Sequence, residues 1–430
     1  MPKPFVGIDF GTTNSSVART LPEGGVELAR FAAGESLTES YRSLLYLELV
    51  EDGRAKRVKS WTGPAGIEQY LAAETKGRLI QSLKSFLSAR SLQSTEVFGR
   101  RMRLEDLISR ILRDLRESAG KQFGIDLRAA VVGRPVRFVG AETEEDNAFA
   151  EQRLRDSLLH AGFETVKFEL EPVAAAHYYE STLDHDELIL IGDFGGGTSD
   201  FSLLHVGPGI LRRGRMPTDF LGNSGLGLAG DAFDAKLVRH LVSPELGRGS
   251  EAESLGKVLP AVPNWVYAKL ERWHHLSFLR TSAVMTMLRS TLATAYEPAK
   301  IEALMHLVNE DLGYHLHRAV QRVKCDLSAH PQATFRFSDG GFEIEAVVTR
   351  AEFDEWIAEE LARIEGCVDG LLAQAGVDPG DVDMVFLTGG SSFVPAVRRI
   401  FETRFGARRI RTGDEFTSVA QGLACKAAEG

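Results

Sequence analysis

Two copies of one short motif place the strongest constraint on how this chain can fold. The first copy, Asp9–Ser15, reads DFGTTNS, and the second, Asp193–Ser199, reads DFGGGTS. Each copy follows an apolar stretch that predicts a β-strand, and each precedes a second predicted strand. A repeated strand–loop–strand unit predicts two related lobes that face each other across a cleft.

Each of these loops joins a carboxylate at a strand end to glycines and hydroxyl side chains. Glycine lacks a Cβ atom, so backbone N–H groups in such a loop can approach phosphate oxygens closely. The carboxylates of Asp9 and Asp193 suit Mg²⁺, which takes one or two carboxylates and keeps several waters. One loop alone is equally typical of a β-hairpin turn. Two matched loops favour binding of phosphate and Mg²⁺.

Strands and helices alternate in both halves of the 430-residue chain, which predicts an α/β fold of two or three domains. Apolar runs predict strands at 5–10, 16–19, 129–133, 165–170, 188–194, 200–205, 333–337, 342–348 and 384–388. Helical spacing of apolar residues predicts helices at 103–121, 142–162, 172–181, 350–375, 394–405 and 417–428. Further helical stretches are expected within 64–90, and 230–330 is expected to be mostly helical with a break at 243–264.

Composition excludes some classes of function. The chain has 50 Lys and Arg against 60 Asp and Glu residues, so it lacks the surplus cations that non-specific nucleic-acid binding requires. The three cysteines are far apart and form no CxxC pair, and no apolar run reaches the ~20 residues that cross a membrane. We expect a cytoplasmic protein with no nucleic acid and no membrane as partner. Six arginines are interpreted as the solvated face of one helix: Arg100, Arg101, Arg103, Arg110, Arg113 and Arg116.

Three further patterns resemble functional motifs but lack their context. Asp193–Gly195 spells the metal-binding motif of protein kinases, yet no HRD catalytic loop precedes it. Gly225–Gly230 matches G-x-G-x-x-G, and we interpret it as a close backbone approach at a helix start because no βαβ unit is expected there. Neighbouring histidines such as His315 and His317 point to different helix faces, so they predict no metal site.

Five segments in chain order carry a family resemblance. They are Gly7–Ser15, Ser82–Leu87, Glu171–Ala176, Gly192–Asp200 and Leu387–Ser392. In this order they resemble the first phosphate loop, the catalytic-lysine segment, the "EPTAAA" segment, the second phosphate loop and the adenosine loop of the DnaK-type chaperones, the 70-kDa heat-shock proteins. The match covers the whole chain and is closest to the short YegD-like members. Actin and the sugar kinases are wider relatives.

The resemblance implies a two-lobed, actin-like ATPase fold of the α/β class, with duplicated ribonuclease-H-like sheets that flank a nucleotide cleft. Lobe I would comprise 1–187, with a base at 1–33 and 127–187 and an outer part at 34–126. Lobe II would comprise 188–411, with a base at 188–222 and 345–411 and an outer part at 223–344. Residues 412–430 would return to lobe I as a closing helix.

The resemblance also implies roles for single residues around ATP or ADP and Mg²⁺. Asp9 and Asp193 would organise Mg²⁺. The phosphates would contact Gly11, Thr12, Thr13, Asn14, Gly195, Gly196, Gly197 and Thr198. Hydrolysis would depend on Lys84, Glu171, Asp193, Thr198 and Asp200. Read without the family, Lys84 is typical of an exposed helical lysine and Glu171 of a helix-start carboxylate.

The adenosine side departs from the family pattern. The resemblance places the nucleoside against Gly230, Gln321, Lys324, Ser328, Gly389, Gly390, Ser391 and Phe393. Gln321 stands for a glutamate of the family, and Cys325 and Phe393 stand for the two arginines that sandwich the adenine. Phe393 can still stack on the base through its aromatic face. We therefore expect weaker or less selective binding of the base, with phosphate binding retained.

The outer part of the second half is longer than in the family. The extra segment, 243–310, is expected to form a helical hairpin with its own small core, with Val266, Leu270 and Trp273 on one face; the alternative is a surface for a protein partner. We expect no β-sandwich substrate domain after residue 430, so peptide clamping of the DnaK kind is not assumed. The resemblance implies a chaperone-like protein that hydrolyses Mg-ATP slowly to switch conformation. The alternatives are a nucleotide-gated scaffold with little turnover and a small-molecule kinase.

Overall fold

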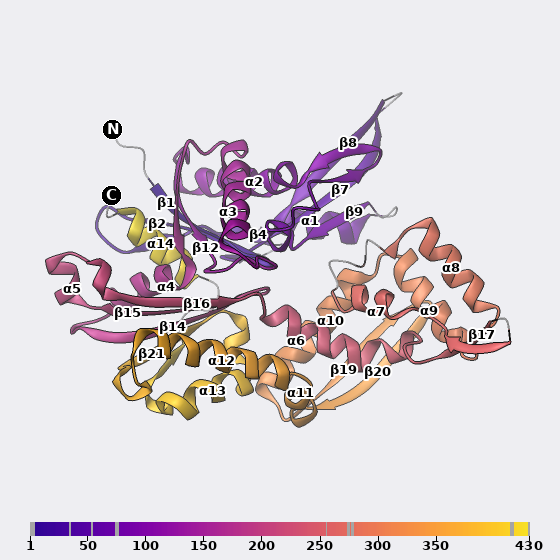
Figure 1. Ribbon diagram of the computed structural model, residues 1–430. Coiled ribbons are helices and arrows are strands. Elements are labelled where there is room, and N and C mark those ends of the chain that lie inside the picture. The colour runs from indigo at the N-terminus through magenta and orange to yellow at the C-terminus, as the bar shows by residue number, and fades with distance from the viewer. Residues whose placement is uncertain are drawn as a thin grey trace. The chain divides into compact units, whose positions relative to one another are not determined.

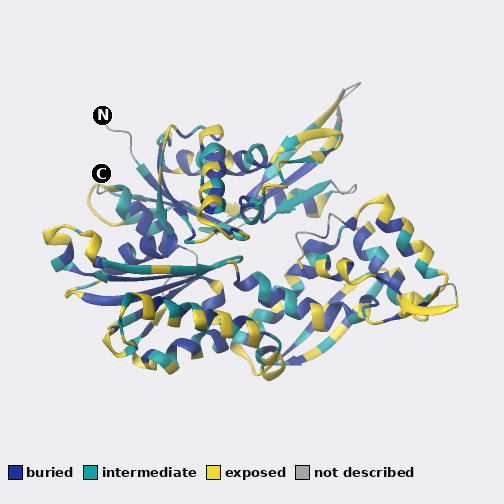
Figure 2. Cartoon of the chain, viewed as in Figure 1, coloured by how far each residue is buried: buried dark blue, intermediate teal, exposed yellow. Residues whose placement is uncertain are grey.

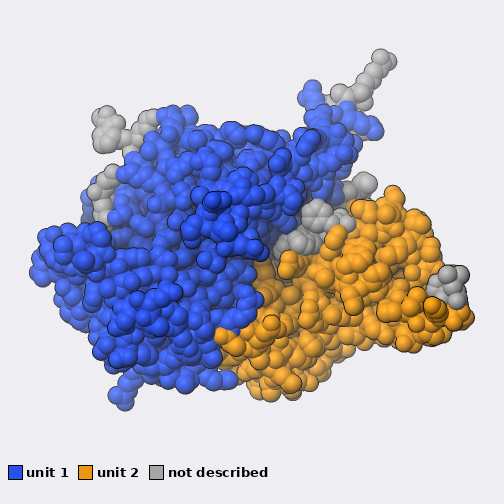
Figure 3. Space-filling view, viewed as in Figure 1, with its two compact units in different colours: residues 1–230, 363–392, 397–430 blue, residues 231–362, 393–396 orange. Residues whose placement is uncertain are grey.

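The computed structural model describes residues 5–33, 36–52, 55–73, 77–254, 256–272, 276, 279–412 and 417–428 (Figure 1). The chain divides into two compact units (Figure 3). Unit 1 comprises 1–230, 363–392 and 397–430, and unit 2 comprises 231–362 and 393–396. The predicted lobe boundary near residue 187 falls inside unit 1, and the predicted domain limits stay a prediction.

Unit 1 opens with a strand-rich half. In chain order its elements are β1 (Phe5–Phe10), β2 (Asn14–Thr20), β3 (Val26–Leu28), β4 (Phe31–Ala33), β5 (Ser36–Thr38), β6 (Tyr41–Arg42), β7 (Leu44–Asp52), β8 (Ala55–Thr62), α1 (Gly63–Ala72), β9 (Arg78–Gln81), the 3-10 helix η1 (Leu83–Phe86), β10 (Ser94–Val97), β11 (Arg100–Arg103), α2 (Leu104–Phe123), β12 (Ala129–Arg134), α3 (Glu144–His160), β13 (Thr165–Leu170) and α4 (Glu171–Glu180).

The second half of the chain contains the remaining strands and a group of helices. In chain order they are β14 (Glu187–Phe194), β15 (Ser199–Val206), α5 (Pro208–Arg213), β16 (Phe220–Leu226), α6 (Gly230–Leu237), β17 (Glu251–Ser254), β18 (Lys257–Pro260), α7 (Asn264–Leu270), α8 (Ser282–Leu292), α9 (Pro298–Asn309), α10 (Gly313–Ala329), β19 (Gln332–Asp339), β20 (Phe342–Thr349), α11 (Arg350–Trp356), α12 (Ala358–Ala375), β21 (Met384–Thr388), the 3-10 helix η7 (Gly390–Phe393), α13 (Pro395–Phe405), β22 (Ile410–Thr412) and α14 (Ser418–Ala428).

Two sheets of the same topology form the base of unit 1. The first has the order β3-β2-β1-β12-β13, and the second has the order β16-β15-β14-β21-β22. In both, the first three strands are antiparallel and the last two join the central strand in parallel. The two DFG loops connect equivalent strands, β1 to β2 and β14 to β15. This arrangement confirms the predicted α/β class and the duplicated sheets.

Helices α4 and α14 lie between these sheets. Alanines of α4 and two aliphatic residues of α14, Val419 and Leu423, share one core with Ile191 of β14 and Val131 of β12. The helices approach at backbone distance, because a Cβ atom on Gly422 of α14 would lie 1.7 Å from the carbonyl oxygen of Ala174 on α4. Gly7 of β1 permits a similar approach to Ala420, where a Cβ atom would lie 2.4 Å from its oxygen. Buried residues run through this layer in Figure 2.

Two local predictions are wrong, and one is confirmed with an addition. The segment 64–90 does contain helical stretches, α1 and η1, and a strand, β9, lies between them and pairs antiparallel with β7. Arg100, Arg101 and Arg103 do not lie on a helix face, because they belong to β11, which pairs with β10. The stretch 350–375 is two helices, α11 and α12, and not one.

Unit 2 contains most of the predicted helical segment and the expected hairpin, β19–β20. Within 243–310, Val266 and Leu270 of α7 are fully buried, as expected for a segment with its own core, and Trp273 lies outside the described residues. A second hairpin, β17–β18, occupies part of the predicted break. None of the helices in the described part of the chain is long and apolar enough to cross a membrane.

Candidate phosphate and metal site

Lys84 and Glu171 form a buried ion pair in unit 1. Lys84 is the second residue of η1. This helix begins directly after Ser82, whose left-handed backbone (φ +54°) turns the chain away from β9. Glu171 is the first residue of α4 and precedes Pro172. The ammonium Nζ of Lys84 donates to Oε1 of Glu171 at 2.6 Å, and the two side chains are 8% and 7% exposed. Lys84 is therefore not the exposed helical lysine of the alternative interpretation.

Three aspartates lie at equivalent ends of the duplicated hairpins. Asp9 is the penultimate residue of β1, and Asp193 is the penultimate residue of β14. Asp200, in β15, is the register partner of Asp193. Its Oδ1 accepts the backbone N–H of Val136 at 2.8 Å. The sheet topology thus places the carboxylates predicted for metal binding and hydrolysis at corresponding strand ends.

Burial and mutual repulsion change the acidity of this group. Burial, followed by the charge of Glu171, raises the pKa of Asp9 to about 7, although Lys84 opposes this shift. The same two causes raise the pKa of Asp200 to about 7. Burial and the charges of Glu171 and Asp9 raise the pKa of Asp193 well above its usual value. The pKa of Lys84 is also raised: burial lowers it, but the charges of Glu171 and Asp9 outweigh burial.

The donor set fits Mg²⁺. Four carboxyl groups share the ammonium of Lys84, so negative charge exceeds positive charge among these five side chains, and a cation would relieve the repulsion. Carboxylate oxygens are the ligands that Mg²⁺ prefers. In the described part of the chain no three His, Cys, Asp or Glu side chains form a ready-made metal cage. Mg²⁺ needs none, because it keeps several waters and also takes phosphate oxygens.

Glycines bring the two loops close together. A Cβ atom on Gly197 would lie 2.9 Å from Val139, and 3.5 Å from the hydroxyl oxygens of Thr12 and Ser85. The second loop therefore lies beside the first loop and beside the segment that carries Lys84. Gly11 permits the tight first loop, because its Cβ atom would lie 2.1 Å from the carbonyl oxygen of Asn14. These contacts place the backbone of both predicted phosphate loops around one site.

The third predicted loop joins the same site. Thr388 of β21 is the register partner of Asp193. Gly389 follows with φ +84°, and a Cβ atom there would lie 2.1 Å from the carbonyl oxygen of Phe194. Gly390 and Ser391 begin η7. Gly230 also reaches the second loop, where its N–H donates to the carbonyl of Gly195 at 3.4 Å.

The remaining predicted adenosine residues belong to unit 2. Gln321, Lys324 and Ser328 are spaced along one face of α10. Nζ of Lys324 lies 2.7 Å from Oδ1 of Asp234, and Phe393 is 38% exposed. The contact of these residues with a nucleoside stays a prediction.

The run Gly225–Gly230 agrees with its interpretation. A Cβ atom on Gly225 would lie 2.5 Å from Oδ1 of Asp200, which is a close approach, and Gly230 is the first residue of α6. The run begins in β16, which is antiparallel to β15, so the G-x-G-x-x-G match has no βαβ context.

Sequence reasoning missed the residues that support the site. Asn147 of α3 accepts the N–H of Phe138 at 3.0 Å and donates to the carbonyl of Val136 at 2.9 Å, and this holds the segment that binds Asp200. Arg42 of β6 donates to Oδ1 of Asn14 in the first loop at 3.1 Å. These three hydrogen bonds join residues that are not adjacent in sequence, and no local pattern in the sequence marks them.

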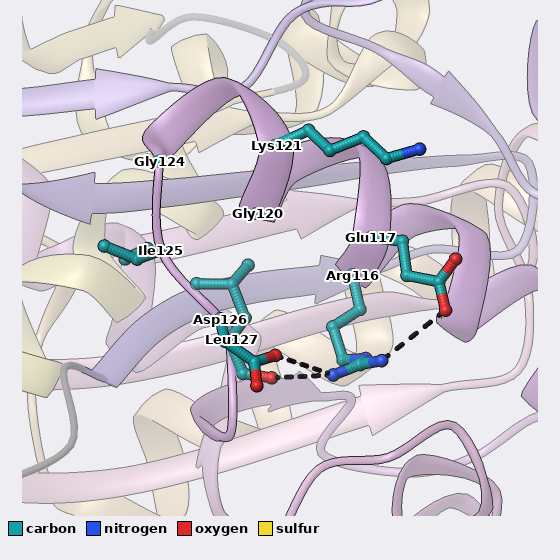
Figure 4. Close-up of a pocket in the computed structure, with 8 residues that line it drawn as sticks. All are labelled: Arg116, Glu117, Gly120, Lys121, Gly124, Ile125, Asp126 and Leu127. Atoms are coloured by element: carbon teal, nitrogen blue, oxygen red, sulfur yellow. Dashed lines mark hydrogen bonds and ion pairs between the residues drawn. The ribbon is translucent and has the colours of Figure 1, made fainter.

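A pocket elsewhere in unit 1 contains none of the residues predicted for the nucleotide or metal site. It lies at the C-terminal end of α2 (Figure 4). The guanidinium of Arg116 crosses it and donates to Oδ1 of Asp126 and to the carbonyl of Leu127. We assign no ligand to it.

Comparison with known proteins places the chain in a family. The model of the family described as Hsp70 protein matches residues 69–250 and 299–428. The chain belongs to this family, and its fold class is that of the family's actin-like ATPase domain. The match leaves out residues 1–68 and, between its two parts, residues 251–298, which lie within the segment predicted to be longer than in the family.

Relatives match nearly the whole chain. The chaperone protein DnaK of Thermotoga maritima is 25% identical over 424 residues, which cover 98% of this chain and 59% of that protein. The chaperone protein DnaK of Thermus thermophilus is 26% identical over 443 residues, which cover 98% of this chain and 60% of that protein. The chain thus spans about three fifths of the length of these relatives.

Proposed function

We propose that this chain is a chaperone-type ATP-binding protein whose unit 1 binds the triphosphate of Mg-ATP between the duplicated loops and hydrolyses it slowly. The observation that carries the proposal is the buried Lys84–Glu171 pair beside Asp9, Asp193 and Asp200. Membership of the Hsp70 family supports the assignment. Coupling of hydrolysis to a conformational switch is part of the proposal.

The side chains supply positioning and charge, which phosphoryl transfer needs more than covalent help. Backbone N–H groups of the two loops donate to phosphate oxygens. Asp9 and Asp193 hold Mg²⁺ directly or through its waters, and the ion offsets negative charge on the phosphates. Lys84 donates hydrogen bonds toward the γ-phosphoryl group, and Glu171 orients its ammonium. Asp200, with a pKa of about 7, accepts a proton from the attacking water.

Phosphate release in the presence of Mg-ATP tests this proposal, with Asp193→Asn as the variant. Losing one carboxylate affects the highly charged transition state most, so turnover should fall by about a hundredfold while calorimetry still detects ATP binding. Equal turnover in the variant and the wild type would remove Asp193 from the site. GTP and inorganic triphosphate in the same titrations measure how much affinity the base contributes.

A second candidate, a nucleotide-gated scaffold with little turnover, is favoured by the internal segment 251–298, which the family model leaves unmatched. This segment exposes Val258, Leu259, Trp265 and Tyr296. A scaffold would bind ATP and release almost no phosphate. A small-molecule kinase would instead release phosphate poorly and label an added acceptor, so one assay with candidate acceptors separates the three functions.

A further inference from the structure

Arg153 of α3 is a buried arginine that the proposed chemistry does not use. It is 5% exposed, and its Nε donates to a carboxylate oxygen of Glu105, which lies in the first turn of α2. The rest of its guanidinium donates to backbone carbonyls of the segment that follows Lys84. These carbonyls belong to Phe86, Leu87, Ala89 and Leu92, at 3.4, 3.2, 3.2 and 3.0 Å.

The segment that Arg153 contacts has little regular structure of its own. After the four-residue η1, its local backbone bonds are single turns, such as Leu87 N–H to the Lys84 carbonyl at 3.2 Å and Leu92 N–H to the Ala89 carbonyl at 3.1 Å. A short 3-10 helix has weak internal hydrogen bonds. The position of Lys84 therefore depends on tertiary contacts more than on local structure.

We propose that Arg153 is a positioning residue that fixes Lys84 against Glu171 by holding the segment 82–92 on α3. Hydrogen bonds from a charged donor are stronger than those between neutral groups, and the planar guanidinium can reach several acceptors at once. Glu105 fixes the orientation of the guanidinium and offsets the cost of burying its charge. Without these bonds, the segment would move and Nζ would leave Oε1 of Glu171.

Helix α3 also offers a matched control. Arg155 lies two residues further on, donates to the carbonyl of Val166 at 2.9 Å and covers the ring of Phe168. Like Arg153, whose guanidinium lies over the ring of Phe149, it bonds a backbone carbonyl and contacts an aromatic ring, but no hydrogen bond among the described residues joins it to the Lys84 segment. Arg155 is partly exposed, so Arg155→Met reports the cost of losing an arginine of this helix that does not bond that segment.

The first test needs no nucleotide and does not depend on the proposed function. Acetylation of Lys84 in the nucleotide-free protein is followed by mass spectrometry, with exposed Lys121 of α2 as the internal reference. Arg153→Met should raise the rate at Lys84 at least roughly tenfold, because local opening exposes the ammonium. Arg155→Met should leave the rate unchanged. A wild-type rate in Arg153→Met, or equal increases in both variants, overturns the proposal.

The second test rests on the proposed ATPase activity. Arg153→Met should lower kcat about tenfold to a hundredfold and leave the KM for ATP within about twofold, because displacing Lys84 affects the transition state. When Arg153→Met is combined with Lys84→Met, kcat should fall almost no further than in Lys84→Met alone, since both changes act through the ammonium of Lys84. Additive losses overturn the positioning role. If the wild type has no turnover but acetylation responds as expected, the proposed function fails and the positioning role stands.

A milder substitution tests the proposal if Arg153→Met does not fold. Arg153→Lys keeps the positive charge beside Glu105 but has too few donors in the right plane to reach four carbonyls. Lys84 should be acetylated faster in Arg153→Lys than in Arg155→Lys. Equal rates in these two folded variants overturn the proposal.

Discussion

At the scale of single residues, the site is organised around a charge that is costly to bury. Burying Lys84 and Glu171 away from water costs free energy that their mutual attraction only partly offsets. The nearby carboxylates keep Lys84 protonated by raising its pKa. An ammonium held in this state can act on a developing negative charge without reorganisation, which is the arrangement that favours a transition state.

Lys84→Met should therefore lower kcat by about a hundredfold and leave the Kd for ATP nearly unchanged. The reason is that, in the proposed function, Lys84 acts mainly on charge that develops during hydrolysis. Steady-state phosphate release gives kcat, and calorimetry gives Kd. Lys121→Met, a change at an exposed lysine of α2, is the control. If kcat does not change in Lys84→Met, the lysine has only a structural role.

Phe393→Arg should tighten ATP binding by about 1 kcal/mol, the scale of a partly exposed cation–π contact. If position 393 faces the base, as the resemblance implies, the planar guanidinium would supply a stacking cation there. Inorganic triphosphate, which has no base, should bind almost equally to the variant and the wild type. An unchanged preference for ATP over triphosphate would show that position 393 does not face the base.

At the scale of elements, the layer between the two sheets depends on positions that accept no side chain. Helix α14 contacts α4, β1 and β2, and α4 contacts β14 and β15. Gly422 and Gly7 allow the backbones to meet, because a methyl group at either position would overlap a carbonyl oxygen. Since α4 begins at Glu171, this packing also positions Glu171.

Gly422→Ala should destabilise the protein by roughly 2 kcal/mol or more, because the added methyl group forces α14 away from α4. Gly366→Ala on α12 is the matched control. A Cβ atom on Gly366 meets nothing within 4 Å, so this change should stabilise the protein by about 0.5–1 kcal/mol through the unfolded chain. Urea unfolding measures both. Equal effects of the two changes would contradict the packing described for α14.

At the scale of the whole molecule, the buried carboxylates couple folding to pH. The pKa values of Asp9 and Asp200 are raised to about 7 in the folded protein, so the folded state holds protons that the unfolded state releases at lower pH. Stability then falls as pH rises toward the folded pKa values, and the loss is complete above them. A bound cation would replace the protons and remove this loss.

The nucleotide-free protein should therefore melt at a higher temperature near about pH 6 than near about pH 8. Asp200→Asn should reduce this difference and raise the melting temperature at the higher pH, since one repulsive charge is lost. Mg-ATP should stabilise the wild type more at the higher pH, by mass action on the folded state. Calorimetric melting curves give all three results. A melting temperature that rises with pH would contradict the assigned pKa shifts.

The sequence by itself determined the α/β class, the duplicated loops and the carboxylates at the ends of β1 and β14, because all of these depend on local patterns. Apolar runs and small residues next to a strand-end aspartate indicate strands and turns without knowledge of the partner. Strand β9 and the β10–β11 hairpin escaped prediction because short strands gain their stability from the strand they pair with.

Only the tertiary structure decided which residues support the site. Arg153 reaches the Lys84 segment, Asn147 holds the residues that bind Asp200, and Gly225 passes close to that carboxylate. Each contact joins residues that are not neighbours in the chain, and its strength depends on burial and exclusion of water, which no local pattern encodes. The same cause raises the pKa of Asp9 and Asp200, since a carboxylate acquires its acidity from the charges and the solvent that folding leaves around it.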